Sequence, residues 1–170
     1  MKKIMCIPAA YLLVIVVFGI GEAKATTISS ITHNSSSIGR YTKYELTFTL
    51  SRTYTNPFEP CEVDVTATFH QPDGTDVNIP GFYYRLYNPS GSNPETYPTA
   101  GAISWKARFA PSQLGSHTCD IIVKDVDGTA TVTSAKTFTC TESGKNGFIS
   151  IDPNQHDFLK YANGDTYLPI

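Results

Sequence analysis

Apolar and polar residues alternate along several segments of this chain, and this alternation predicts β-strands. In the segment 44–51 the apolar residues Tyr44, Leu46 and Phe48 are separated by polar residues. Residues at every second position of a strand project from the same face, so the segment has one apolar and one polar face. Helical periodicity is absent outside the N-terminal leader. Four further segments repeat the pattern, at 61–69, 103–109, 117–123 and 130–140.

Strands with one apolar face are typical of antiparallel sheets that bury those faces against each other. The turn dipeptides Asp73-Gly74 and Asp127-Gly128 supply the positive φ angles that tight turns require. About seven such strands predict an all-β fold, an immunoglobulin-like antiparallel β-sandwich. Trp105 lies on an apolar face, which favours a place in the core over contact with a ligand. The predicted core includes Phe48, Val65, Phe69, Trp105, Phe109 and Ile121.

The first 25 residues have the pattern of a signal peptide. Two lysines follow the initiator Met1, an apolar run covers 9–20, and Ala23-Lys24-Ala25 offers small residues for cleavage. The apolar run is shorter than the roughly 20 residues that a membrane-spanning helix needs, so a retained anchor is the weaker interpretation. The mature chain is expected to begin near Thr26, to be secreted or periplasmic, and to have no membrane association after cleavage.

Charge and motif content exclude several classes of function. The chain has 13 basic and 15 acidic residues, and no cluster of Lys or Arg predicts binding to nucleic acid or anionic lipid. No spacing typical of a metal site, phosphate loop or dinucleotide fingerprint occurs, so no metal, cofactor or catalytic residue is predicted. Acidic residues on flat sheets lack the enclosed setting of a general acid, so catalysis by this domain alone is not expected. The four histidines are scattered, at His33, His70, His117 and His156.

Three cysteines remain after signal cleavage, and each falls on the apolar side of its segment. In an immunoglobulin-like layout Cys119 and Cys140 lie on adjacent antiparallel strands, which makes them the candidate disulfide pair. A tight turn near Asp127 would instead place Cys119 opposite about residue 134, so the bridge requires a bulge near 134–136. The alternative is that Cys61, Cys119 and Cys140 are three buried free thiols.

The segment 82–102 is predicted to be a long loop, because it combines several Pro and Gly residues with four tyrosines. Long loops in compact domains are commonly functional or disordered. Tyrosine rings contact other domains and also pack on sugar rings. The four candidate contact residues, for a domain or for a carbohydrate, are Tyr83, Tyr84, Tyr87 and Tyr97.

Several of these segments together resemble the immunoglobulin-like N-terminal domain, a domain of unknown function, of secreted bacterial glycoside hydrolases. The most specific part is Trp105 to Pro111 followed by Gly115, where an amphipathic strand leads into a Pro/Gly turn. The family usually carries aromatic residues after that glycine, whereas this chain has His117 and Cys119. The other matching segments are 56–58, Phe69 with Pro72 and Gly74, 79–83, 147–149, Phe158, Tyr161, 163–164 and 167–170.

The resemblance implies that the β-domain is an accessory domain of a larger enzyme, and it indicates which domain is the expected partner. In that family the β-domain precedes a (β/α) barrel of apiosidase-like or cellulase-like kind, whose catalytic residues lie at the ends of the barrel strands. The expected organisation is a signal peptide at 1–25, the sandwich at 26–144, and a linker, a hairpin and the first barrel strand at 145–170.

The expected function is non-catalytic support of a polysaccharide-degrading barrel, which is the expected partner and is missing from this chain. The domain would dock on that barrel, with the polysaccharide as a second expected partner. The alternative is a carbohydrate-binding or surface-adhesion module. These residues alone do not make the chain an enzyme.

Overall fold

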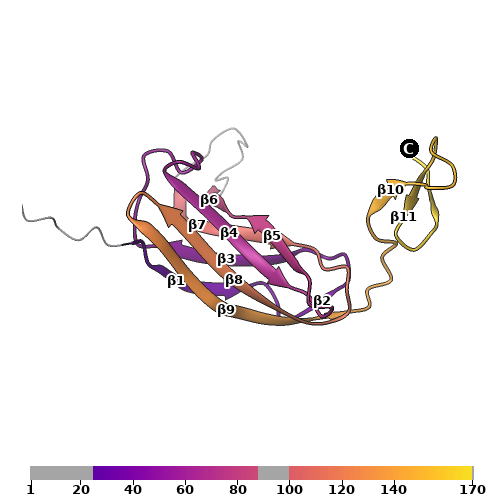
Figure 1. The fold of residues 1–170 in the computed structure, drawn as a ribbon, viewed down its shortest axis with the longest axis horizontal. Coiled ribbons are helices and arrows are strands. Elements are labelled where there is room, and N and C mark those ends of the chain that lie inside the picture. The colour runs from indigo at the N-terminus through magenta and orange to yellow at the C-terminus, as the bar shows by residue number, and fades with distance from the viewer. Residues whose placement is uncertain (1–24, 88–99, 170) are drawn as a thin grey trace, which may run out of the picture.

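Two β-sheets pack face to face and form most of the molecule (Figure 1). The computed structural model describes residues 25–87 and 100–169. Neighbouring strands run antiparallel except for β2 and β9, which are parallel. One sheet has the order β1 (Ile28–His33), β3 (Tyr44–Leu50), β7 (Ala100–Phe109) and β6 (Phe82–Tyr87). The other has the order β2 (Ser37–Gly39), β9 (Gly128–Thr141), β8 (Gly115–Asp125), β4 (Val63–His70) and β5 (Asp76–Pro80).

This all-β, antiparallel arrangement follows the predicted alternation of apolar and polar residues. β4 has buried and less buried residues at strictly alternating positions, and β8 does so along most of its length. The apolar faces of the two sheets meet, as an antiparallel β-sandwich requires. Immunoglobulin-like topology in the stricter sense remains a prediction from the sequence.

The core consists of two clusters, one toward each end of β3. Tyr44 belongs to the first cluster with Phe69 from the opposite sheet, and Phe48 belongs to the second with Val65 from the opposite sheet. Each cluster therefore joins side chains from both sheets. All six side chains assigned to the core from the sequence are at most 8% exposed: Phe48, Val65, Phe69, Trp105, Phe109 and Ile121.

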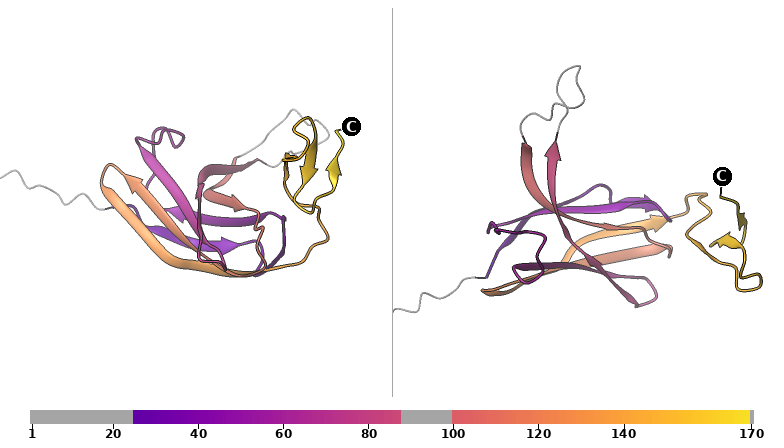
Figure 2. Two further views of the ribbon diagram at one scale, coloured as in Figure 1. Left: turned by 45° about the vertical axis from the view of Figure 1, so that its right-hand side comes forward. Right: turned by 90° about the horizontal axis from the view of Figure 1, so that it is seen from above.

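The outer ends of β6 and β7 depart from the sandwich. They project as a pair of strands beyond the opposite sheet (Figure 2), with Tyr87 paired to Ala100 where the described residues end. Ile103 is consequently 43% exposed, although its position in the alternating pattern assigned it to the apolar face. The prediction for Ile103 was wrong because the facing sheet does not extend far enough to cover it.

A bulge in β9 absorbs the predicted mismatch between β8 and β9. The register passes from Ile121 opposite Val132 to Cys119 opposite Lys136, which leaves extra residues on β9. Ser134 has a φ of 49°, and its backbone N–H donates a 2.7 Å hydrogen bond to a carboxylate oxygen of Asp120. The predicted bulge near 134–136 is confirmed.

His117 takes the place of an aromatic residue in the first core cluster. Its ring stacks on Phe138 with centroids 4.9 Å apart and planes inclined by 14°. Nδ1 donates to the backbone oxygen of Gly115 at 3.1 Å, while the buried Nε2 has no partner among the described residues. Burial lowers the pKa of His117, more than the hydrogen bond to Gly115 raises it. The neutral imidazole therefore packs as a flat ring.

A third, smaller sheet follows the sandwich and contains the predicted hairpin. It has the order β10 (Ile149–Ile151), β11 (Leu159–Tyr161) and β12 (Thr166–Tyr167). The rings of Phe148 and Tyr41 meet edge to face at 5.2 Å, which connects this sheet to the sandwich. Gly147 has a φ of 94°, and a Cβ there would lie 2.6 Å from that of Ala162 and 2.9 Å from the Tyr41 ring. Glycine is thus required at the junction by both conformation and space.

Some predictions lie outside the described residues. Nearly all of the expected signal peptide, residues 1–24, and the candidate contact residue Tyr97 belong to this group. In the part of the chain that is described, no helix has the length and apolar character needed to cross a membrane.

Candidate functional site

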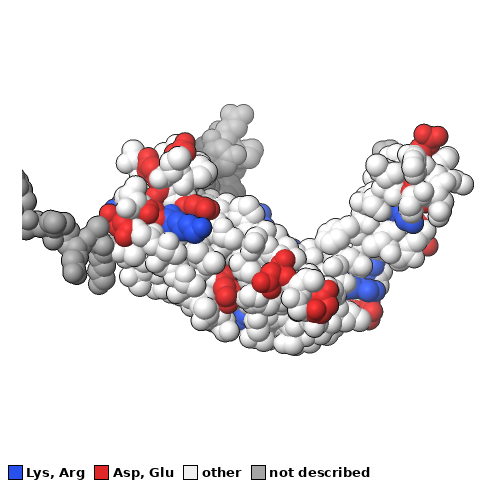
Figure 3. Space-filling view, viewed as in Figure 1, with Lys and Arg blue, Asp and Glu red and all other residues white. Residues whose placement is uncertain are grey.

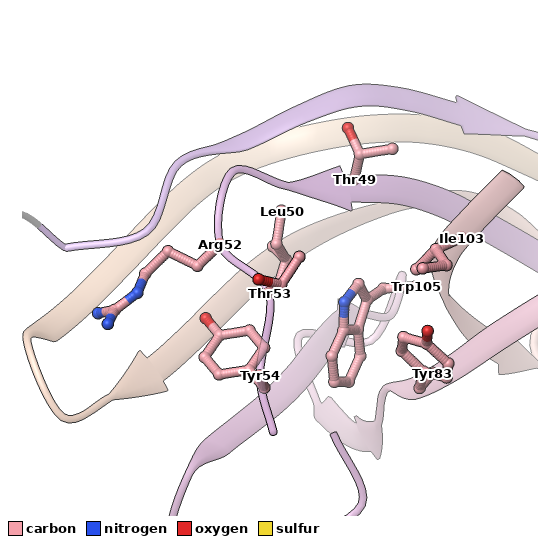
Figure 4. Close-up of a pocket in the computed structure, with 8 residues that line it drawn as sticks. All are labelled: Thr49, Leu50, Arg52, Thr53, Tyr54, Tyr83, Ile103 and Trp105. Atoms are coloured by element: carbon pink, nitrogen blue, oxygen red, sulfur yellow. The ribbon is translucent and has the colours of Figure 1, made fainter. Parts of the chain in front are cut away.

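The candidate site is a cleft where the end of β3, the loop after it and the paired strands β6 and β7 meet. Its cavity volume is about 350 Å³, within the range of small-molecule sites. Leu50 and Ile103 line it with apolar surface, and Thr53 contributes a hydroxyl group. The hydroxyl of the lining residue Thr49 instead bonds to Ser29. Figure 4 shows Leu50 and Thr53 on one side of the Trp105 indole and Ile103 on the other.

Three aromatic side chains form the walls of the cleft. Tyr54 and Tyr83 lie on either side of Trp105 (Figure 4), with ring centroids 6.3 and 5.8 Å from it. Both tyrosine rings are nearly perpendicular to the indole, at 90° and 82°. Trp105 itself is only 4% exposed. It is a core residue whose edge reaches the cleft, and the tyrosine rings supply more of the accessible aromatic surface.

Ionised side chains hold one wall of the cleft in place. Arg52 Nη1 lies 3.4 Å from Asp125 Oδ2 and also pairs with Asp127. The hydroxyl of Tyr54 donates to Asp125 Oδ2 at 3.0 Å, and the Asp125 side chain is completely buried. Burial raises the pKa of Tyr54, so its hydroxyl stays protonated near neutral pH. Two carboxylates offset the single guanidinium, which leaves this wall without net positive charge.

A second, shallower groove lies on the other side of Tyr83. Its volume is about 210 Å³, and Pro57, Phe58 and Pro80 are among its lining residues. The rings of Phe58 and Tyr83 meet edge to face at 5.7 Å, yet Phe58 is 72% exposed. Aromatic surface therefore continues from the cleft onto the loop between β3 and β4.

The outer face of the β1-β3-β7-β6 sheet carries a row of paired charges and aromatic rings. Lys106 Nζ lies 4.5 Å from the ring centre of Tyr84, and the Arg108 guanidinium lies 5.0 Å from that of Phe82. Burial alone would raise the pKa of Glu45, but hydrogen bonds from Lys106 and Arg108 outweigh it and hold the pKa at about 2. A carboxyl group with so low a pKa is ionised at neutral pH and unsuited to act as a general acid.

Charges on the opposite sheet are dispersed and paired in part. Figure 3 shows acidic side chains spread along the face that it displays, with basic side chains beside some of them. His70 bridges Asp76 and Asp120, with nitrogen–oxygen distances of 2.7 and 3.2 Å. In residues 25–87 and 100–169, no group of three or more His, Cys, Asp or Glu side chains is placed to hold a metal ion.

The structure separates the three predicted contact tyrosines that it describes. Phe82–Tyr87 is a strand, so the expectation of a continuous loop over 82–102 was wrong. Tyr83 lines the cleft, Tyr84 lies on the outer face beside Lys106, and Tyr87 is 52% exposed at the end of β6. Alternation along β6 therefore sends neighbouring tyrosines to opposite faces.

Sequence reasoning did not identify Arg52 and Tyr54 as site residues. Both lie in the loop after β3, where the alternating pattern ends. Their partner Asp125 is about 70 positions away in the chain. No local motif indicates such a pairing, although an aromatic and a cationic residue directly after an amphipathic strand are a usable signal.

The cysteines do not form the predicted bridge. Cys140 lies opposite Gly115, four residues along β8 from Cys119, and at about 3.3 Å per residue the two are about 13 Å apart along the sheet. A disulfide requires Cα atoms within about 7 Å, and Cys61, Cys119 and Cys140 are all free. Cys119 and Cys140 are buried as the alternative predicted, but Cys61 is exposed because β4 begins only at Val63.

The third sheet exposes an unusual amount of apolar surface for its size. Its strands and connections are short, and six aliphatic or phenylalanine side chains on them are at least 37% exposed, while Tyr161 and Tyr167 pack against each other. Exposed apolar groups gathered in one small element mark a surface for protein contact. These residues, named here the C-terminal apolar surface, are Phe148, Ile149, Ile151, Phe158, Leu159 and Leu168.

The fold and the site define an antiparallel β-sandwich module with an aromatic cleft at one end and an apolar surface near the other. A family model described as a domain of unknown function, DUF5060, matches residues 37–124. That match covers half of the chain, and the protein belongs to this family. It runs from β2 almost to the end of β8 and so includes both walls of the cleft. No curated protein matches the chain.

Proposed function

We propose that this protein is the non-catalytic accessory domain of a secreted polysaccharide-degrading glycoside hydrolase, and that it docks on and supports the catalytic barrel of that enzyme. The C-terminal apolar surface is the observation that carries the proposal. Ile151 and Leu168 are 63% and 71% exposed. Covering a side chain of this size stabilises a contact by about 1.5 to 3 kcal/mol.

The position of this surface suits a contact between domains of one polypeptide. The edge-to-face contact of Tyr41 with Phe148 and the tight packing at Gly147 hold the third sheet beside the start of β3. A domain that covers the sheet would therefore lie at a defined place relative to the sandwich. The resemblance to N-terminal domains of secreted glycoside hydrolases supplies the class of that partner, a (β/α) barrel.

The first test identifies the native polypeptide. An antibody raised against residues 26–144 is used to isolate the protein from the culture medium of its host, and its mass and hydrolytic activity are measured. The expected polypeptide carries a barrel of about 250 residues in addition to the β-sandwich that begins near Thr26, and it releases reducing sugar from a polysaccharide. A native protein without such a domain, or without hydrolytic activity, would overturn the proposal.

A second test addresses docking in that native enzyme. The double variant Ile151→Ser with Leu168→Ser is expected to lower the temperature at which activity is lost, because it removes apolar groups from the contact. Val126→Ser is the matched control, since Val126 is 75% exposed in the β8–β9 turn, beyond the other end of β3. Equal behaviour of the control and the double variant would contradict docking through this surface.

A further inference from the structure

The cleft at Trp105 has features of a binding site that docking of a barrel does not use. It opens beside Leu50, at the end of β3, whereas Tyr41 and the C-terminal apolar surface lie beyond the start of that strand. The two surfaces thus lie toward opposite ends of the sandwich. A ligand in the cleft would leave the C-terminal apolar surface free.

The shape of the cleft suits a small cyclic ligand. Tyr54 and Tyr83 stand on either side of the Trp105 edge, both nearly perpendicular to it (Figure 4). Three aromatic rings thus line one side of the cleft. Its volume of about 350 Å³ lies toward the lower end of the range for small-molecule sites. A cleft of this size fits one or two rings and excludes a folded partner.

The polar lining of the cleft can bind a ligand that carries hydroxyl groups. The Thr53 hydroxyl both donates and accepts hydrogen bonds, whereas the Arg52 guanidinium donates only and is turned toward Asp125 and Asp127. Hydrogen bonds to Asp125 fix Tyr54 and Arg52 in advance, so little conformational entropy remains to be lost on binding. The indole nitrogen of Trp105 faces the loop of Thr53 (Figure 4), on the side where the polar groups lie.

The charged side chains around the cleft favour a neutral ligand over an anionic one. Arg52 is the cation that lines the cleft, and it is already paired with Asp125 and Asp127. An anionic ligand would be repelled by these two carboxylates, and the one guanidinium that could attract it is already paired with them. A neutral ligand with apolar C–H faces and polar edges meets no such penalty. Pyranose rings have this character, because their C–H faces pack on aromatic rings while their hydroxyls bond to polar groups.

We propose that the cleft lined by Tyr54, Trp105 and Tyr83 binds a neutral pyranose unit of a saccharide. The aromatic rings hold a C–H face of the sugar ring, and the Thr53 hydroxyl bonds to its hydroxyls. The ring thus lies against the edge of Trp105. Such a site adds a sugar contact at the end of the sandwich away from the docking surface, and it is available whether or not a barrel is docked there.

The test measures binding of defined saccharides to the chain from Thr26 to Ile170 by isothermal titration calorimetry. The probes are the neutral trisaccharides cellotriose, xylotriose and mannotriose, with trigalacturonate as the anionic comparison. At least one neutral probe is expected to bind with a dissociation constant of about 1 mM or lower, and more tightly than trigalacturonate. Tighter binding of trigalacturonate, or no binding of any neutral probe, would overturn the proposal.

Variants locate the binding in the cleft. Tyr83→Ala removes one wall, and Thr53→Trp fills the mouth from an exposed loop position without disturbing the core. Each is expected to weaken binding by about tenfold or more, which corresponds to at least about 1.4 kcal/mol. Tyr87→Ala is the matched control, because Tyr87 is exposed on the same strand but does not line the cleft.

Two outcomes would place the sugar outside the cleft. Unchanged affinity in Thr53→Trp, or equal loss in Tyr87→Ala, would mean that it binds elsewhere and would refute the assignment. Thr53→Trp keeps the test decisive if Tyr83→Ala does not fold. Because no barrel is present in the experiment, a negative result leaves the docking proposal unaffected, and the native enzyme tests that proposal separately.

Discussion

Replacing Trp105 by alanine tests whether this residue supports the core as well as the cleft. The indole is 4% exposed and belongs to the cluster that joins β3 and β7 to the opposite sheet. A large aromatic side chain buries about 150 to 250 Å², and at about 25 cal/mol per Å² this burial is equivalent to about 4 to 6 kcal/mol. Area measured against an extended chain overstates the true change, and Trp→Ala substitutions typically cost about 3 to 5 kcal/mol.

The adjacent cleft moves the expected value toward the lower end of this range. The space left by the indole would open into an existing cavity of about 350 Å³, so water can enter it and no sealed void forms. We therefore expect Trp105→Ala to lower the free energy of unfolding by about 3 kcal/mol, the smaller of the usual values for such a change. That is a large share of the about 5 to 15 kcal/mol typical of a domain.

The measurement is urea denaturation followed by circular dichroism, because the variant lacks the only tryptophan of the chain. Ile103→Ala is the matched control on the same strand, and since Ile103 is 43% exposed it should cost less than about 1 kcal/mol. A loss under about 1 kcal/mol for Trp105→Ala, or an equal loss for the control, would refute the assignment of Trp105 to the core.

Two histidines predict opposite responses of stability to pH, and the cysteines predict a pattern of thiol reactivity. Burial lowers the pKa of His117, so stability should fall as the pH drops below about 6.5, where only the unfolded chain takes up the proton. His117→Phe should remove this loss, and an unchanged acid response in urea melts would contradict the reasoning. Hydrogen bonds to two carboxylates raise the pKa of His70. Its contribution is therefore fully present below about pH 6.5 and lost as the pH rises through the raised pKa. His70→Gln should abolish that contribution, and urea midpoints on either side of pH 6.5 would show whether it does. Thiol titration of the unfolded, non-reduced chain from Thr26 onward should count Cys61, Cys119 and Cys140 as free. In the native protein Cys61 should react first, because burial raises the pKa of Cys119 to about 11; a count of one free thiol would restore the bridge.

Strand alternation made the sheets and much of the core predictable. Phe48, Phe69 and Trp105 were assigned to the core from period-two spacing alone, and all three are buried. The bulge near Ser134 was also predictable. A tight turn at Asp127 sets one pairing of β8 with β9, and the apolar positions farther along β9 fit that pairing only if β9 contains extra residues. These features depend on residues that are close neighbours in the chain, so local patterns are enough to predict them.

Features that depend on distant segments were predicted less well. The predicted disulfide was wrong because the bulge shifts the β9 partner of Cys119 by only two positions, from residue 134 to Lys136. Cys140 still lies four residues beyond Lys136, opposite Gly115. The prediction of a loop over 82–102 was wrong at its start. Pairing with β7 places Tyr83 and Tyr84 in a strand despite the nearby Pro and Gly residues. The cleft escaped prediction because Arg52 and Tyr54 acquire their fixed positions from Asp125 on β8.

The sequence by itself determined that this protein is built from antiparallel strands with one buried face. Apolar side chains at every second position lie on one face of a strand, and packing two such faces together removes them from water. Only the tertiary structure decided how far the opposite sheet extends over the apolar face of each strand. The facing sheet stops short of Ile103, and β6 turns Tyr83 toward Trp105 while the loop after β3 brings Tyr54 to the other side. A cleft exists there because burial along a strand is local, whereas the extent of the partner sheet depends on the packing of the whole chain.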